Sequence, residues 1–240
     1  MNTPDPGARV SILNLQLGTA NSVMTPAMAH AGIEALSTAL RDPDIRVIVL
    51  TGSDEQFCLG AVEQTRGVAG AAPAPADTDV AFIDALHDWL LALHDSDKPV
   101  IAAVEGEARG AGLALALACD LIVASRSAQF SLPVAAQLSG QSAGALWFAA
   151  QRLAVPSLLS ELLLLDTPLA GERAHQLGLV CRLADPGLAL QDAVQLAKGM
   201  ARHAPASLAM LKQQLLDVAA RPLHEALSDE RNRWLQSNAY

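Results

Sequence analysis

Basic residues are scarce in this sequence. Lys and Arg together number 16 against 25 Asp and Glu, which gives a formal net charge of −9. A nucleic-acid-binding domain normally carries a clustered excess of positive charge, so this class is disfavoured, although a small basic cluster could still meet the phosphates of a cofactor. No apolar run approaches the ~18–20 residues of a membrane helix, and residues 1–7 lack the features of a signal peptide. We therefore expect a cytoplasmic protein.

Cysteine is also rare. Cys58, Cys119 and Cys181 are widely separated, and each lies in apolar sequence. This pattern differs from the dense, even spacing of a disulfide scaffold and from the paired spacing of a zinc site. We interpret all three as reduced thiols in the core, and we predict no metal site.

The composition instead indicates a globular α/β protein. The 240 residues are 51% hydrophobic, enough for one sizeable core. A strand at 9–17 is followed by a helix that opens at Thr25 and Pro26 and by a continuous apolar strand at 47–50, which together form a β-α-β unit. Further segments continue the pattern: strands at 99–104 and 121–124, a short strand or loop at 129–132, and helices at 80–94, 113–118, 190–202, 207–216 and 223–235.

Residues 63–79 form a predicted mobile loop, because 67–76 are low in complexity and show no periodicity. A disordered surface insertion is the simpler interpretation, and a lid that orders over a ligand is the alternative. The last predicted helices are amphipathic and need another surface to cover their apolar faces. Contact between subunits would supply it.

Two segments have the pattern of an oxyanion-binding site. The first follows the strand at 47–50 and continues through FCLGA at 57–61, and the second is GEARGAG at 106–112, which leads into an apolar helix. Backbone N–H groups at a turn or a helix start can bind developing negative charge. These two segments would explain the binding of an oxyanion, but they supply no acid or base.

With these two segments and the strands before them, the chain resembles the enoyl-CoA hydratase/isomerase family, also called the crotonase superfamily. The resemblance extends over nearly the whole chain and includes Asn21 in the turn after the first strand. It rests on VIVLTG at 47–52, FCLGA at 57–61, KPVIAAVEG at 98–106, LALACDLIVAS at 115–125, AGERA at 170–174 and LGLV at 177–180.

The resemblance implies a crotonase-like spiral of β-β-α units over residues 1–188 and a C-terminal helical region at 189–240 for oligomerisation, as a homotrimer or homohexamer. It also implies that the ligand is a coenzyme A thioester, acting as substrate, with no separate cofactor required.

Matched residue by residue, the two oxyanion donors are the backbone N–H groups of Ala61 and Ala111. Leu59, Gly60 and Gly110 would lie beside the bound thioester. The second donor is ordinarily glycine in this family, so Ala111 preserves the site unless its position requires a positive φ. We expect a tighter but usable pocket.

The catalytic carboxylates of the family's hydratases are absent. Their two glutamates correspond to Ala114 and Val134, neither of which can exchange a proton. A positioned acid or base supplies roughly 10²–10⁴ in rate, whereas one oxyanion donor contributes about 2.7–4 kcal/mol. Ordinary hydration is therefore disfavoured, and either another residue transfers the proton or the protein only binds thioesters.

Glu107 and Ser142 are the substitutes that we consider first. Glu107 and its neighbour Glu105 are close to the second segment, although solvated loop charges or partners of Arg109 are the more ordinary interpretation. Ser142 falls where the dehalogenase branch of the family carries its nucleophilic carboxylate. With Ser139 and Gln141 it could orient a water, but a helix N-cap or a loop hydrogen bond is the commoner role.

The remaining candidates each have an ordinary structural explanation. His87 and His94 could shuttle protons from one helix face, or simply lie on its surface. Asp120 aligns with an aspartate of the family that we interpret as structural. We interpret Trp147 and Trp234 as core or interface residues. Three basic side chains could contact coenzyme A phosphates or be exposed helix charges: Lys212, Arg231 and Arg233.

Three hypotheses follow from the sequence. The first is an enzyme that binds an acyl-CoA and stabilises a thioester oxyanion or enolate. The second is a catalytically silent binding or assembly subunit of the same fold, motivated by Ala114 and Val134. The third, a serine hydrolase of related fold, has little support because no Ser, His and Asp arrangement is evident.

Overall fold

The computed structural model describes residues 9–15, 24–60, 76–133 and 143–218. Its strands are β1 (Val10–Asn14), β2 (Val47–Thr51), β3 (Val100–Val104), β4 (Glu107–Arg109), β5 (Leu121–Ser125), β6 (Gln129–Ser131), β7 (Leu169–Ala170) and β8 (Arg182–Ala184). Its helices are α1 (Pro26–Arg41), α2 (Ala76–His94), α3 (Ala111–Ala118), α4 (Ala145–Arg152), α5 (Pro156–Leu164), α6 (Gly171–Gln176), α7 (Ala189–Met200) and α8 (Pro205–Val218).

The strands form two sheets. The larger sheet has the order β1-β2-β3-β5-β8, and every pairing in it is parallel. The smaller sheet has the order β4-β6-β7, in which β4 and β6 are parallel and β6 and β7 antiparallel. Consecutive parallel strands need crossover connections, and α1 and α2 supply the first two.

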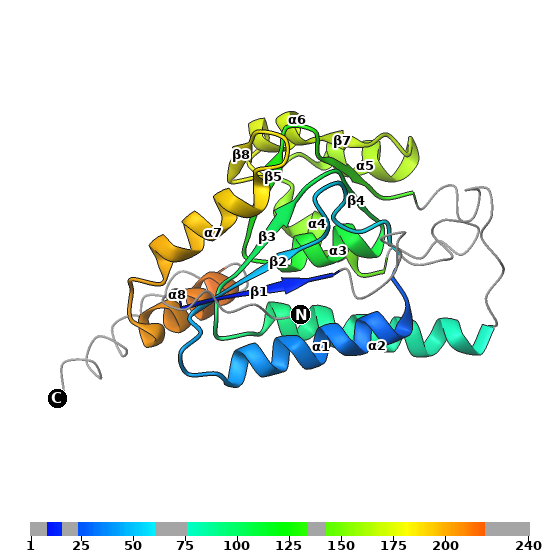
Figure 1. Cartoon of the computed structure of the whole chain (residues 1–240). Coiled ribbons are helices and arrows are strands. Elements are labelled where there is room, and N and C mark those ends of the chain that lie inside the picture. The colour runs from blue at the N-terminus through cyan, green and yellow to red at the C-terminus, as the bar shows by residue number, and fades with distance from the viewer. Residues whose placement is uncertain (1–8, 16–23, 61–75, 134–142, 219–240) are drawn as a thin grey trace.

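Both faces of the large sheet are covered, which explains why its central strands β2 and β3 are mainly apolar and buried along their whole length. Ile48 and Leu50 of β2 pack into the cluster that contains α1, α2 and α3, whereas Val47 and Val49 point to the opposite face. That face is covered by α7, which contributes small side chains at Ala189, Ala193 and Ala197. Figure 1 shows α7 along one side of the sheet and α1 with α2 beside the other.

The predicted start of α1 is confirmed. Thr25 is its N-cap, and the Thr25 hydroxyl accepts a hydrogen bond from the N–H of Met28 at 3.3 Å. Pro26 follows in the first turn, where its missing N–H has no intrahelical role. Gly32 then lets α1 approach α2 closely, because a Cβ at this position would overlap the indole ring of Trp89.

The sequence-based assignments differ most from the structure at two places. Helix α2 begins at Ala76, so it includes residues 76–79 that we assigned to the end of the mobile loop. Residues 107–109, assigned to a continuous glycine loop, instead form strand β4. This strand is too short to show a periodicity of its own, and its partner β6 is distant in sequence. The predicted helix at 223–235 lies outside the described residues.

The prediction of three core thiols is correct for Cys58 and Cys119 and wrong for Cys181. All three are free thiols, but Cys181 is exposed, since it immediately precedes the edge strand β8. Burial raises the pKa of Cys58 to about 11 and that of Cys119 to about 12, with the nearby Asp120 charge contributing to the second shift. These two thiols therefore stay protonated near neutral pH and act as small apolar side chains.

Within the described ranges, no helix combines the length and the apolar character that a membrane crossing needs.

Candidate active site

The first of the two segments folds back sharply after β2. A Cβ on Gly52 would lie 2.5 Å from the Cα of Phe57, so only glycine allows this return of the chain. Phe57 is completely buried and holds the returning segment in the core. Cys58 then pairs with β4, because its N–H donates to the carbonyl of Glu107 at 3.1 Å and its carbonyl accepts from the N–H of Arg109 at 2.9 Å. The two predicted segments are thus hydrogen-bonded to each other.

Two further glycines let the backbones approach closely. Gly106 has φ +54, and a Cβ there would overlap the carbonyl oxygen of Glu55. Gly112, in the first turn of α3, faces Cys58 directly: a Cβ at Gly112 would overlap the Cys58 carbonyl oxygen and lie 2.7 Å from the Cys58 Cβ. The start of α3 is therefore placed against the first segment by direct contact with its backbone.

Helix α3 begins with Gly110 as N-cap and Ala111 as its first residue. Gly110 has φ +53, and its N–H donates to the carbonyl of Ser131 at 3.0 Å. Among the described residues other than glycine, positive φ occurs only at Ala143 and Asp166. Ala111 thus has ordinary backbone geometry, and an alanine at this position needs no strained conformation.

The environment of α3 favours an interaction with negative charge. All eight of its residues, Ala111 to Ala118, are buried and apolar, so solvent screens the helix weakly. The N–H groups of a first helical turn point along the helix axis and form its positive end. An oxyanion at this end would be stabilised by backbone groups alone.

Of the other predicted binding residues, Leu59 and Gly60 complete the first segment. Gly60 has φ +81, and its carbonyl accepts a hydrogen bond from the N–H of Met24 at 2.7 Å, so the segment is also tied to the entrance of α1. Leu59 is half-buried. Ala61, the predicted first donor, and Ser142 lie outside the described residues, as does Val134.

Glu107 has the ordinary role that we considered, as a partner of Arg109. Its Oε1 accepts a hydrogen bond from the Ser131 hydroxyl at 2.8 Å and forms an ion pair with an Arg109 nitrogen at 3.5 Å. Both charged side chains are about one third exposed. Because Ala108 between them points into the core, Glu107 and Arg109 project from the other face of β4.

Glu105 and Lys212 correct the sequence interpretation. Glu105 is neither a solvated loop charge nor a partner of Arg109: it is 6% exposed, and its Oε1 accepts a hydrogen bond from the N–H of Ala189 at 2.8 Å, at the start of α7.

Lys212 is neither an exposed charge nor available for a phosphate, because its side chain is 4% exposed and bonded to protein acceptors. One of these acceptors is Asp120, whose structural role is confirmed by its hydrogen bond from the N–H of Val100 at 2.7 Å. Arg231 and Arg233 lie outside the described residues.

The histidines of α2 have different surroundings. His87 is exposed, whereas His94 packs edge-on against Trp147 and Phe148, with ring centroids 5.6 and 5.7 Å away. Trp147 is 54% exposed, so it is not a core residue and an interface role stays a prediction. Trp234 lies outside the described residues. In the described part of the chain, no group of three or more His, Cys, Asp or Glu could hold a metal ion.

The sequence matches known proteins over most of its length. The family model described as Enoyl-CoA hydratase/isomerase matches residues 7–237. The chain belongs to the enoyl-CoA hydratase/isomerase family. Among its relatives, 2,3-dehydroadipyl-CoA hydratase of Escherichia coli K12 is 34% identical over 93% of this chain and 84% of that protein. The 1,2-epoxyphenylacetyl-CoA isomerase of the same organism is 32% identical over 85% of this chain and 77% of that protein.

A solved structure supports the fold assignment. An enoyl-CoA hydratase from Polaromonas sp. JS666 superposes with a TM-score of 0.87 at 33% identity, covering 100% of this chain and 91% of that one. The predicted crotonase fold is therefore confirmed. Ala114, where the resemblance places a glutamate, is completely buried among apolar residues of α3.

The contact between Gly112 and Cys58 generates a stability prediction. Gly112→Ala forces the added Cβ into the Cys58 backbone, and we expect a loss of about 1–3 kcal/mol in the free energy of unfolding, as for other overpacked sites. Chemical denaturation measures the change. Gly199→Ala is the matched control, because a Cβ at this exposed position of α7 meets nothing within 4 Å and should gain about 0.5–1 kcal/mol. Equal effects of the two substitutions would contradict the close packing.

Proposed function

We propose that this protein binds an acyl-CoA and stabilises the oxyanion or enolate form of its thioester through the backbone N–H groups of Ala61 and Ala111. The observation that carries the proposal is the placement of Gly112 against the backbone of Cys58. This contact fixes the positive end of α3 beside the segment that leads to Ala61. Family membership supports the ligand class, because the relatives named above act on coenzyme A thioesters.

Backbone donors in a buried, apolar setting suit this chemistry. They are already oriented before the charge develops, so no reorganisation accompanies the reaction. Each well-placed donor is worth about 2.7–4 kcal/mol to the transition state. Ala111 offers such a donor without a glycine, because its φ is not in the left-handed region.

Proton transfer in this chain requires an atypical group. Ala114 has no titratable atom, so we do not propose ordinary hydration with the usual glutamates. Glu107 is a candidate acid or base, although its carboxylate already accepts a hydrogen bond from Ser131 and pairs with Arg109. Ser142 is the second candidate, as a group that orients a water. The reaction we propose is therefore a lyase or isomerase step on an acyl-CoA with a non-standard proton carrier.

A catalytically silent binding or assembly subunit is the second candidate. The observation that favours it is again Ala114: the first turn of α3 offers a thioester only apolar side chains and backbone. Turnover of an acyl-CoA distinguishes the enzyme from the catalytically silent subunit. Detection of any product from a panel of acyl-CoA thioesters by liquid chromatography, abolished by Gly112→Ala but not by Gly199→Ala, would exclude the silent subunit.

Acyl-CoA titration tests ligand binding itself. We expect the melting temperature to rise with acyl-CoA concentration, because a ligand that binds only the folded state at 100 times its Kd stabilises it by about 2.7 kcal/mol. Gly112→Ala should lose this rise and Gly199→Ala should keep it. An unchanged melting temperature of the parent protein at millimolar acyl-CoA would contradict the proposal.

The C-terminal region, 189–240, is proposed to join copies of the chain into a trimer or a hexamer. Helix α8 supports this proposal, since Met210, Leu211 and Leu215 are 43%, 52% and 73% exposed on one helix of a single copy. Sedimentation equilibrium of the full chain should give three or six times the monomer mass, and polar substitution of the three residues should lower it. A monomer mass for the parent would contradict the assembly.

A further inference from the structure

Helix α3 carries no polar side chain. Its eight residues, AGLALALA, pack through apolar contacts, which are not directional and so do not by themselves fix the position of the helix along its axis. Directional contacts occur at its two ends. At the N-terminal end the Gly110 N–H donates to the carbonyl of Ser131, and Gly112 packs directly against the Cys58 backbone.

The C-terminal end of α3 is bound by two cations from distant helices. The Arg152 guanidinium of α4 donates to the carbonyl of Cys119, the C-cap residue of α3. The next residue, Asp120, accepts the N–H of Val100 at 2.7 Å and the Lys212 ammonium at 3.0 Å through the same oxygen, Oδ2. Cations near carbonyl groups at a helix end also interact favourably with the helix dipole.

Lys212 is the more unusual of the two cations because it is almost completely buried. Besides Asp120, its ammonium donates to the Leu93 carbonyl at 3.1 Å, the Ser96 hydroxyl at 2.9 Å and the Lys98 carbonyl at 3.4 Å. A buried charge is retained at low cost only when its partners satisfy it in good geometry. The position of the ammonium is therefore well determined by these acceptors, which come from the end of α2 and from the residues before β3.

We propose that Lys212 is a positioning residue for the oxyanion site: through Asp120 it fixes where α3 lies along its axis, and thereby where the Ala111 N–H points. The inference rests on the proposed function of Ala111. A helix of this length is a hydrogen-bonded rod of about 12 Å, and close-packed interiors have low compressibility and transmit strain. A shift at Asp120 therefore reaches Ala111, and a misplacement of about 1 Å can cost roughly 10²-fold in rate.

The test must separate positioning from simple stabilisation. The probe is 4-(dimethylamino)cinnamoyl-CoA, whose absorption moves to longer wavelength as its thioester carbonyl is polarised. In the parent protein we expect a red shift at saturation. In Lys212→Met the probe should still bind, but its absorption maximum should return toward that of the free thioester, because the donor at Ala111 no longer meets the carbonyl oxygen.

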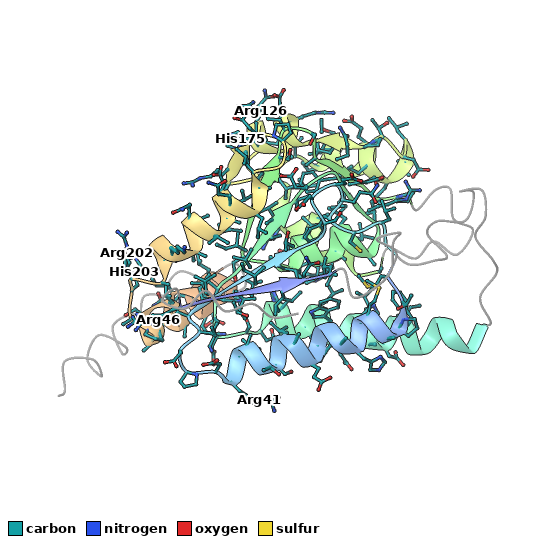
Figure 2. All side chains as sticks on the ribbon, viewed as in Figure 1. Arg41, Arg46, Arg126, His175, Arg202 and His203 are labelled. Carbon is teal, nitrogen blue, oxygen red and sulfur yellow. The ribbon has the colours of Figure 1, made fainter. Side chains whose placement is uncertain are left out.

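Arg46→Met is the matched control. The Arg46 guanidinium likewise donates to two backbone carbonyls, those of Ala201 at 3.0 Å and His203 at 3.1 Å, but these lie at the end of α7. Figure 2 shows Arg46 together with Arg202 and His203 in this region, away from α3. A variant at Arg46 should lose stability as Lys212→Met does and keep the full red shift of the bound probe.

Asp120→Asn provides a second variant for the case in which Lys212→Met does not fold. It keeps an oxygen for the Val100 N–H, weakens the pairing with Lys212 and should reduce the red shift. A full red shift in a folded Lys212→Met or Asp120→Asn protein, while the parent also shows it, would overturn the positioning role and leave the proposed function intact. Absence of both binding and red shift in the parent would overturn the proposed function, and the positioning role with it.

Discussion

The contact between Gly112 and the backbone of Cys58 is the constraint on which the site depends. At this point the first turn of a helix and an extended segment meet with no side chain between them. Gly52 and Gly106 allow the close backbone approaches that bring the segment at 57–61 and the segment at 106–112 together. The hydrogen bonds between Cys58 and β4 then keep the segments aligned. Because these three glycines have no Cβ atom, the backbone that follows β2 and the backbone that follows β3 can come into direct contact.

Polar contacts at helix ends stabilise the packing of the helices around the site, while the core between the sheet and the helices is largely apolar. Glu105 accepts the first N–H of α7, Lys98 donates to the Ala39 and Asp42 carbonyls at the end of α1, and Arg46 binds the end of α7. In each case a charged side chain meets backbone groups that the helix itself leaves unpaired. The apolar contacts supply most of the folding free energy, and these charged contacts make the arrangement of the helices specific.

Local patterns were enough to predict much of the fold. The apolar run at 47–50 identified β2, and Thr25 with Pro26 identified the start of α1, because both signals lie within a few residues. The positions of Glu105 and Lys212 could not be found in this way, since their partners Ala189 and Asp120 are remote in sequence. Strand β4 was missed for the same reason, as its pairing with β6 and Cys58 exists only in three dimensions. A buried charge inside an otherwise apolar helix face, as at Lys212, is the one signal that could have indicated its role.

The candidate site has the fold of its family but no titratable side chain at position 114. In the function that we propose, Ala111 is a backbone donor with ordinary backbone geometry, and the buried Ala114 has no side chain that could exchange a proton. A crystal structure of the protein with a bound acyl-CoA would show where the thioester oxygen lies relative to both backbone donors. We predict that the thioester oxygen lies about 2.7–3.1 Å from the backbone nitrogens of both Ala61 and Ala111. A thioester bound elsewhere on the protein, or with its carbonyl oxygen turned away from the start of α3, would contradict it.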